Sequence, residues 1–141
     1  MLEDLIRNAY SAAAYGATGM VLMLLSFAVI DGLTPGNLRH LLWADRNRNA
    51  GILVGSNAFA VAIIVTAAIV ASEGRLFEGL TYTVVYTIIG VVIMTVTFFI
   101  IDLFTPGKLG ELVVHPESHP AVWMHGVVHV GIAMIVAASI L

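Results

Sequence analysis

The sequence predicts an all-α membrane protein with four transmembrane helices, built from two parallel two-helix repeats. Three observations support this fold class. The chain of 141 residues is 60% hydrophobic and only 11% charged, whereas soluble domains carry about a quarter charged residues. Its charges are clustered, and an eight-residue segment occurs twice. Between the clusters lie four stretches without Asp, Glu, Lys or Arg, at residues 8–30, 49–72, 79–101 and 118–141.

Each charge-free stretch is long enough to cross a hydrocarbon core of about 30 Å, because a helix rises about 1.5 Å per residue. The apolar runs are continuous rather than alternating, which favours helices over the strands of a membrane barrel. Glu3 and Asp4 precede the first run, so its start lacks the basic character of a signal peptide, and we expect it to remain as an anchor. We therefore expect one integral membrane domain over residues 1–141, with internal repeats at approximately 8–72 and 79–141.

The duplicated segment reads Asp-Gly-Leu-Thr-Pro-Gly-Asn-Leu at 31–38 and Asp-Leu-Phe-Thr-Pro-Gly-Lys-Leu at 102–109. Each repeat would contain two membrane crossings, and an even number returns the chain to its starting side. The two repeats must then share one orientation, which places both segments at the same membrane face. Five of the eight positions are identical: Asp31, Thr34, Pro35, Gly36 and Leu38 in the first copy, and Asp102, Thr105, Pro106, Gly107 and Leu109 in the second.

Local rules assign Thr34 as the N-cap and Pro35 as the first residue of a short interfacial helix, because the leucines that follow are spaced i, i+3, i+4. The same pattern follows the second copy. For Asp31 and Asp102 two interpretations stay open. Each carboxylate can accept backbone N–H groups in an Asx turn where the membrane helix ends. Alternatively, the two form a pair of carboxylates on one membrane face that could bind a cation.

The Thr-Pro turn, followed by the basic, Asn-rich segment Asp-Arg-Asn-Arg-Asn-Ala at 45–50, resembles the YjfL-like family of small bacterial inner-membrane proteins, known as domain of unknown function 350. The resemblance implies four helices, a two-fold internal repeat and an inner-membrane location, and it supplies no catalytic residues. The family enters its second and fourth helices through an Asn followed by small residues. The first copy fits this pattern, whereas Glu-Ser-His-Pro-Ala at 117–121 keeps only the Ala.

Three polar side chains fall inside the expected spans. His125 and His129 are four residues apart and share one helix face, and Asn57 needs a partner in lipid. Intramembrane histidines either bond neighbouring helices or mark a metal, haem or proton-relay site. The pair supplies two metal ligands, fewer than a closed site requires, and a bis-His haem would need a second subunit. No cofactor is therefore predicted, and metal or haem at these histidines stays an alternative.

Packing signals occur on two further spans. Gly51 and Gly55 form a Gly-x-x-x-Gly pattern, which allows helices to approach closely. Thr83, Thr87, Thr95 and Thr97 lie in the third span, where their hydroxyls can bond back to carbonyls of their own helix.

The leading functional hypothesis is a small, non-enzymatic inner-membrane protein that forms homo-oligomers or serves as a subunit of a membrane complex. The alternatives are a transport or ion-conducting element using Asp31 and Asp102, and a metal or haem protein using the two histidines. The expected partners are the lipid bilayer, other copies of the chain and other membrane subunits. Nucleic acid is excluded because the net charge is −3 and no basic patch exists. The excess of Lys and Arg near the duplicated segments places them in the cytoplasm and the termini outside.

Overall fold

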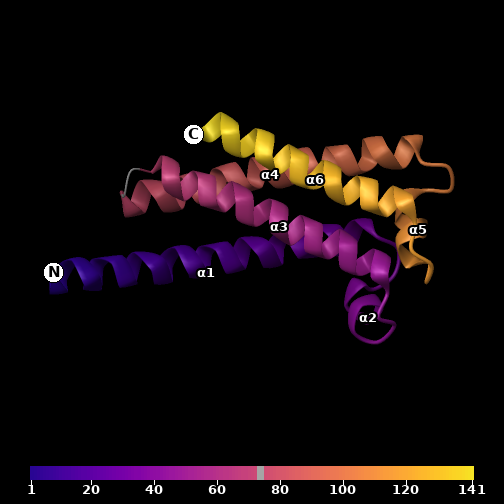
Figure 1. Ribbon diagram of the computed structural model, residues 1–141, viewed down its shortest axis with the longest axis horizontal. Coiled ribbons are helices and arrows are strands. Elements are labelled where there is room, and N and C mark those ends of the chain that lie inside the picture. Colours follow the sequence, from indigo (N-terminus) through magenta and orange to yellow (C-terminus); the bar gives the residue numbers. More distant parts are fainter. Residues whose placement is uncertain (73–74) are drawn as a thin grey trace.

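The computed structural model describes residues 1–72 and 75–141, which form six helices. Four of them are long and apolar enough to cross a membrane: α1 (Leu2–Leu33), α3 (Arg48–Ala71), α4 (Leu76–Phe104) and α6 (Pro120–Ile140). The short helices α2 (Leu38–Trp43) and α5 (Leu109–Val114) lie at one end of the bundle, and both chain termini lie at the other (Figure 1). The prediction of an all-helical chain with four membrane-capable helices is confirmed.

Side-chain caps mark where α3 and α6 begin. The Asn47 side chain accepts the N–H of Ala50 at the start of α3. The His119 side chain accepts the N–H of Ala121 at the start of α6, and Pro120 is the first residue of that helix. A capping side chain satisfies one of the N–H groups that the first helical turn leaves free, and proline there loses no helical hydrogen bond.

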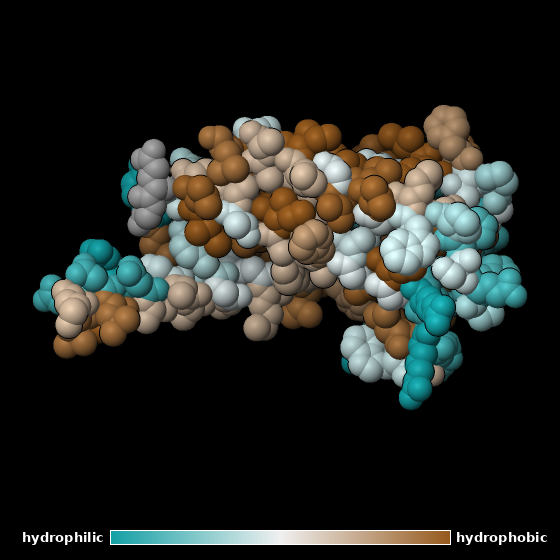
Figure 2. Space-filling view, viewed as in Figure 1, coloured by the Kyte–Doolittle hydropathy of each residue, from teal (hydrophilic) through white to brown (hydrophobic). Residues whose placement is uncertain are grey.

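The long helices differ in how deeply they are buried. In the most apolar 18-residue stretch of each helix, 39% of the residues are buried in α3 and α6 but only 22% in α1 and α4, so α3 and α6 form the centre of the bundle. Residues 1–10 are all exposed, and this end of α1 projects beyond the rest of the molecule (Figure 1). On the face seen in Figure 2, apolar side chains cover the middle of the bundle, while polar ones gather toward its ends.

Two apolar clusters form the interior. The first lies at the α2 and α5 end, where Leu38 and Leu109 are fully buried against Leu53, Phe98 and other residues of the long helices. The second includes Val61, Ile64 and Met94 and lies nearer the termini. Between them, α1, α3 and α6 bury the polar side chains of Ser26, Asn57 and His129. The polar residues thus form a layer inside the bundle, away from its ends.

Candidate functional site

The two Asp residues of the duplicated segment bind backbone in the same way. The N–H of Leu38 donates to Oδ1 of Asp31 at 2.8 Å, and the N–H of Leu109 donates to Oδ1 of Asp102 at 2.6 Å. Each carboxylate therefore reaches across its turn, seven residues along the chain, to the first residue of the following short helix. This geometry differs from the expected Asx turn, in which the backbone N–H donor lies two residues after the Asp. In both copies one carboxylate oxygen is occupied by the protein's own backbone.

Glycines at matching positions shape both turns. Gly36 has φ +98° and Gly107 has φ +90°, the left-handed region that residues with a Cβ rarely adopt. A left-handed residue cannot belong to a right-handed helix, so the short helices begin only after these glycines.

This geometry corrects the assignment of Thr34 as the N-cap of the interfacial helix. Thr34 instead caps the C-terminus of α1, where its N–H donates to the carbonyl of Ile30. The N-cap of α2 is Asn37, whose side chain accepts the N–H of His40. Pro35 consequently lies in the turn rather than in the helix. In the second copy Thr105 likewise caps the preceding helix, α4, and its hydroxyl donates to the carbonyl of Ile101.

Asn47 and Asn49 connect the start of α3 to the segment between α5 and α6. The Asn47 amide donates to the carbonyls of Val114 and His115 at 3.1 and 3.0 Å. The Asn49 amide lies within hydrogen-bonding distance of three carbonyls, and its oxygen accepts the N–H of His119 at 3.0 Å. The three acceptors are those of Leu112, His115 and Glu117. The two copies therefore differ in role here. The asparagines of the first copy bind the backbone of the second copy, which lacks asparagines at the matching positions.

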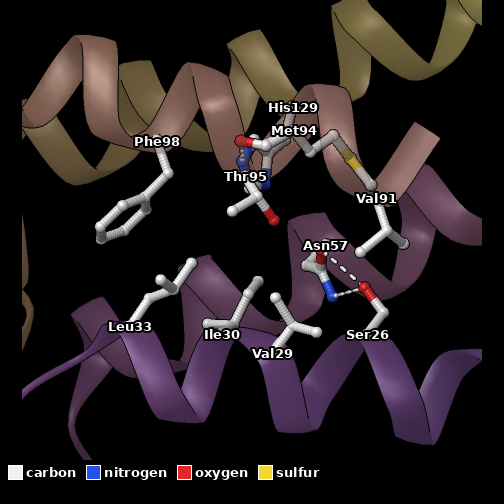
Figure 3. Close-up of a pocket in the computed structure, with 10 residues that line it drawn as sticks. All are labelled: Ser26, Val29, Ile30, Leu33, Asn57, Val91, Met94, Thr95, Phe98 and His129. Carbon is white, nitrogen blue, oxygen red and sulfur yellow. Dashed lines mark hydrogen bonds between the residues drawn. The ribbon is translucent and has the colours of Figure 1, made fainter. Parts of the chain in front are cut away.

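Asn57 pairs with a residue that the sequence analysis did not single out. Its amide donates to the Ser26 hydroxyl at 2.8 Å, and that hydroxyl lies 3.1 Å from the Asn57 carbonyl oxygen. Both side chains are buried, and they join α1 to α3 (Figure 3). Ser26 could have been considered as the partner of Asn57 because it carries a hydroxyl within the first apolar stretch, residues 8–30.

His129 and Thr95 border a small cavity next to this pair. Its volume is about 10 Å³, and the lining residues with polar side chains are Ser26, Asn57, Thr95 and His129 (Figure 3). The Nε2 of His129 lies 3.3 Å from the carbonyl oxygen of Met94 on α4. A cavity of roughly 10–15 Å³ holds one water molecule when it offers two to four polar partners. The site therefore has the dimensions of a single-water site and is far too small for haem.

His125 lies one turn from His129 on α6, and the two rings are 4.1 Å apart between centroids. The Phe98 ring meets His125 edge-on at 5.1 Å. His125 is 0% exposed, and neither of its ring nitrogens has a hydrogen-bond partner within residues 1–72 and 75–141. As metal ligands the pair provides two donors, and no group of three or more His, Cys, Asp or Glu residues gathers in that part of the chain.

Gly51 and Gly55 line an open apolar groove of about 520 Å³ between α3 and α6. A Cβ added to either glycine would meet nothing within 4 Å, and the same holds for Gly131 on the other wall. Gly126 differs, because its added Cβ would lie 3.1 Å from the hydroxyl of Ser56. Gly126 thus permits α3 and α6 to approach each other, whereas Gly51 and Gly55 face out of the protomer.

The fold and its buried polar layer define a small multi-pass α-helical membrane protein. The family model described as "Domain of Unknown Function (DUF350)" matches residues 1–140, and the chain belongs to this family. The resemblance drawn from the sequence is thereby confirmed.

Curated relatives come from mycobacteria. A protein named UPF0719 transmembrane protein from Mycolicibacterium paratuberculosis is 31% identical over 139 residues, covering 99% of this chain and 92% of the relative. UPF0719 transmembrane proteins from Mycobacterium bovis and Mycobacterium tuberculosis are each 33% identical, covering 99% of this chain and 91% of the relative. No solved structure matches this chain.

Proposed function

We propose that this protein is a small, non-enzymatic protein of the bacterial inner membrane that assembles with further copies of itself through the groove between α3 and α6. The observation that carries the proposal is the position of Gly51, Gly55 and Gly131, where an added Cβ would meet no atom of residues 1–72 and 75–141 within 4 Å. Glycine in a helix destabilises it by about 0.5–1 kcal/mol relative to alanine, and no packing contact within one chain offsets this free energy at the three glycines.

Close packing against a helix of a second copy would offset it. Lipid tails are as apolar as leucine, so membrane helices associate through close backbone packing, which small residues permit. The groove lies among α3 and α6 residues within the spans, and its walls are almost entirely apolar. A second copy presents the same groove, so a two-fold interface between identical faces would cover it on both protomers.

We also infer that the chain is one unit written twice, with repeats at about 8–72 and 79–141 and the two Thr-Pro-Gly turns at one membrane face. The matching bonds from Leu38 to Asp31 and from Leu109 to Asp102 support this inference, as do the matching φ angles of Gly36 and Gly107. The same bonds favour a structural role for the two carboxylates over the alternative of an ion-conducting pair.

The substitution Gly55→Leu tests the proposed assembly. A leucine there would fill the groove without a clash in the protomer, so we expect the detergent-solubilised mass to fall from an oligomer to a single protomer. Light scattering coupled to size exclusion measures this mass.

The matched control is Gly16→Leu on α1, where an added Cβ also meets nothing within 4 Å but which lies outside the groove. Its mass should equal that of the unmodified protein. A monodisperse single protomer for the unmodified protein, in mild detergent and by cross-linking in membranes, would refute the proposal.

A further inference from the structure

The six lysine and arginine side chains are paired at one end of the bundle and unpaired at the other. At the end with the termini, Nη2 of Arg7 lies 3.1 Å from Oδ1 of Asp4, and Nη1 of Arg75 lies 2.7 Å from Oε2 of Glu78. The other four lie at the end with α2 and α5, and none has a carboxylate oxygen within 4 Å among residues 1–72 and 75–141. They are Arg39, Arg46, Arg48 and Lys108.

The carboxylates at this end have other partners or none. Asp31 and Asp102 accept the backbone N–H groups that start the two short helices. Asp45 precedes Arg46 in the sequence, yet its Oδ2 lies 3.1 Å from Nδ1 of His40. Two further acidic residues are exposed and pair with no lysine or arginine in the described part of the chain: Glu111 and Glu117. Ion pairing within the protomer therefore does not explain the four cations.

Two of these cations occur where the backbone disfavours them. Arg46 has φ +51° and Lys108 has φ +59°, and among the described residues no other non-glycine residue has a positive φ. This left-handed region favours glycine and asparagine, because other residues bring their Cβ close to the following carbonyl oxygen. Backbone strain of this kind is concentrated at positions that serve function. The charged side chain is therefore the property that distinguishes both positions.

The duplication shows which residue would suit the position of Lys108 better. The matching residue of the first copy is Asn37, whose side chain caps α2 by accepting the N–H of His40. Lys108 precedes α5 in the same place and makes no side-chain cap. Asparagine is among the best N-cap residues, whereas the lysine ammonium has no acceptor atom. The second copy thus has a cation in place of a helix cap.

The outer face of α2 is shaped to receive a polar headgroup. Leu38 and Leu41 are buried under the bundle, whereas Arg39, His40 and Trp43 are exposed on the other side of the helix. These three exposed side chains line an open hollow of about 460 Å³. Tryptophan is enriched at the depth of lipid headgroups, and the Trp43 side chain is 76% exposed. Polar side chains gather at this end of the molecule (Figure 2).

We propose that the end of the bundle with α2 and α5 binds the headgroups of acidic phospholipids through a basic surface formed by Arg39, Arg46, Arg48 and Lys108. Arginine and lysine form charge-assisted hydrogen bonds with phosphate oxygens, and basic clusters next to a membrane span attract anionic lipids. The ligand is a lipid rather than a soluble anion, because the basic surface adjoins the spans. Arg48 is the first residue of α3, and α2 connects α1 to α3.

Quenching of Trp43 fluorescence by brominated lipids tests the proposal. The chain has two tryptophans, so Trp123→Phe leaves Trp43 as the only one. This variant is reconstituted into phosphatidylcholine vesicles with equal small fractions of brominated phosphatidylglycerol or brominated phosphatidylcholine. We expect phosphatidylglycerol to be enriched beside Trp43 by about fivefold or more, the ratio that one basic contact gives near an anionic surface. Added salt should lower this enrichment, because exposed charges are screened.

Two substitutions separate lipid binding from a role in folding. Arg46→Gly and Lys108→Asn remove a cation and place a residue that tolerates the left-handed conformation. Each should lower the enrichment severalfold, while the thermal midpoint in neutral detergent stays equal or rises. The matched control is Arg7→Gln, which removes a cation at the opposite end and should leave the enrichment unchanged.

Three results would overturn the proposal. The first is equal quenching of Trp43 by the two brominated lipids. The second is an enrichment that Arg46→Gly and Lys108→Asn leave unchanged, or one that falls only together with the thermal midpoint, which would indicate a structural role. The third comes from inorganic phosphate added at constant ionic strength: a change in Trp43 emission in pure phosphatidylcholine vesicles would indicate a site for a soluble anion instead.

Discussion

The hydrogen bonds of Asn49 could not be predicted from its position in the sequence. Its amide and carbonyl engage four backbone groups between Leu112 and His119, and the side chain is 1% exposed. One residue from the first half of the chain thereby supplies partners to a carbonyl of α5 and to the irregular backbone that follows this helix. Buried backbone groups need such partners, because leaving them unpaired costs free energy.

Removing this side chain should destabilise the protein. We expect Asn49→Ala to lower the free energy of unfolding by about 1–3 kcal/mol, the cost of leaving buried polar groups without a partner. Thermal unfolding in detergent, followed by circular dichroism, would show a lower midpoint. Asn8→Ala is the matched control, because Asn8 is exposed on α1 and its removal should leave the midpoint unchanged. Equal midpoints for the two variants would contradict the bonding described for Asn49.

At the scale of elements, the turns after α1 and α4 show how a short helix is positioned. Leu38 and Leu109 are 0% exposed, so α2 and α5 are held by packing under the end of the bundle as well as by the Asp carboxylates. Each short helix buries one apolar side: Leu38 and Leu41 in α2, and Leu109 and Val113 in α5. The local rule that put its start at Thr34 was wrong, because Gly36 must first turn the chain through a left-handed conformation.

The glycines of these turns should resist substitution. Gly36→Ala and Gly107→Ala each place a Cβ on a left-handed residue, which costs about 1–2 kcal/mol. We expect both variants to unfold at lower temperature than the unmodified protein. Gly32→Ala is the control, since Gly32 lies within α1 with open space around its added Cβ, and alanine there should be neutral or stabilising by up to about 1 kcal/mol. A lower midpoint for Gly32→Ala alone would contradict the assigned backbone geometry.

At the scale of the whole molecule, both short helices occupy one end of the bundle and both termini the other (Figure 1). Arg39, Arg46, Arg48 and Lys108 belong to the first end, whereas Arg7 and Arg75 belong to the second. The positive-inside tendency therefore favours an orientation with α2 and α5 in the cytoplasm and the termini outside.

Single cysteines can test this orientation because the natural chain contains none. Glu111→Cys on α5 and Asn8→Cys on α1 change no Lys or Arg, and both positions are exposed. A membrane-impermeant maleimide added to intact spheroplasts should label Asn8→Cys and leave Glu111→Cys unlabelled until the cells are opened. The reverse labelling pattern would assign the opposite orientation.

The sequence by itself determined the four helices, because charges cannot be placed in hydrocarbon and their spacing marks where each span ends. It also identified Asn57, His125 and His129 as buried polar residues, because polar side chains within a membrane span usually face the interior of the bundle. It could not identify partners. These partners are distant in the chain and meet only when helices pack: Ser26 for Asn57, the Met94 carbonyl for His129, and the backbone after α5 for Asn49.

Tertiary structure alone also decided which glycines face outward and which threonines are unsatisfied. Gly55 and Gly126 both belong to apolar helices, yet only at Gly126 would an added Cβ have a neighbour within 4 Å. Thr87 and Thr97 lie on one helix and differ only in the face they occupy. Span length follows from local composition, because each residue meets lipid or water independently. Packing contacts and hydrogen-bond partners depend instead on where the other helices lie, and these positions are fixed only when the bundle folds.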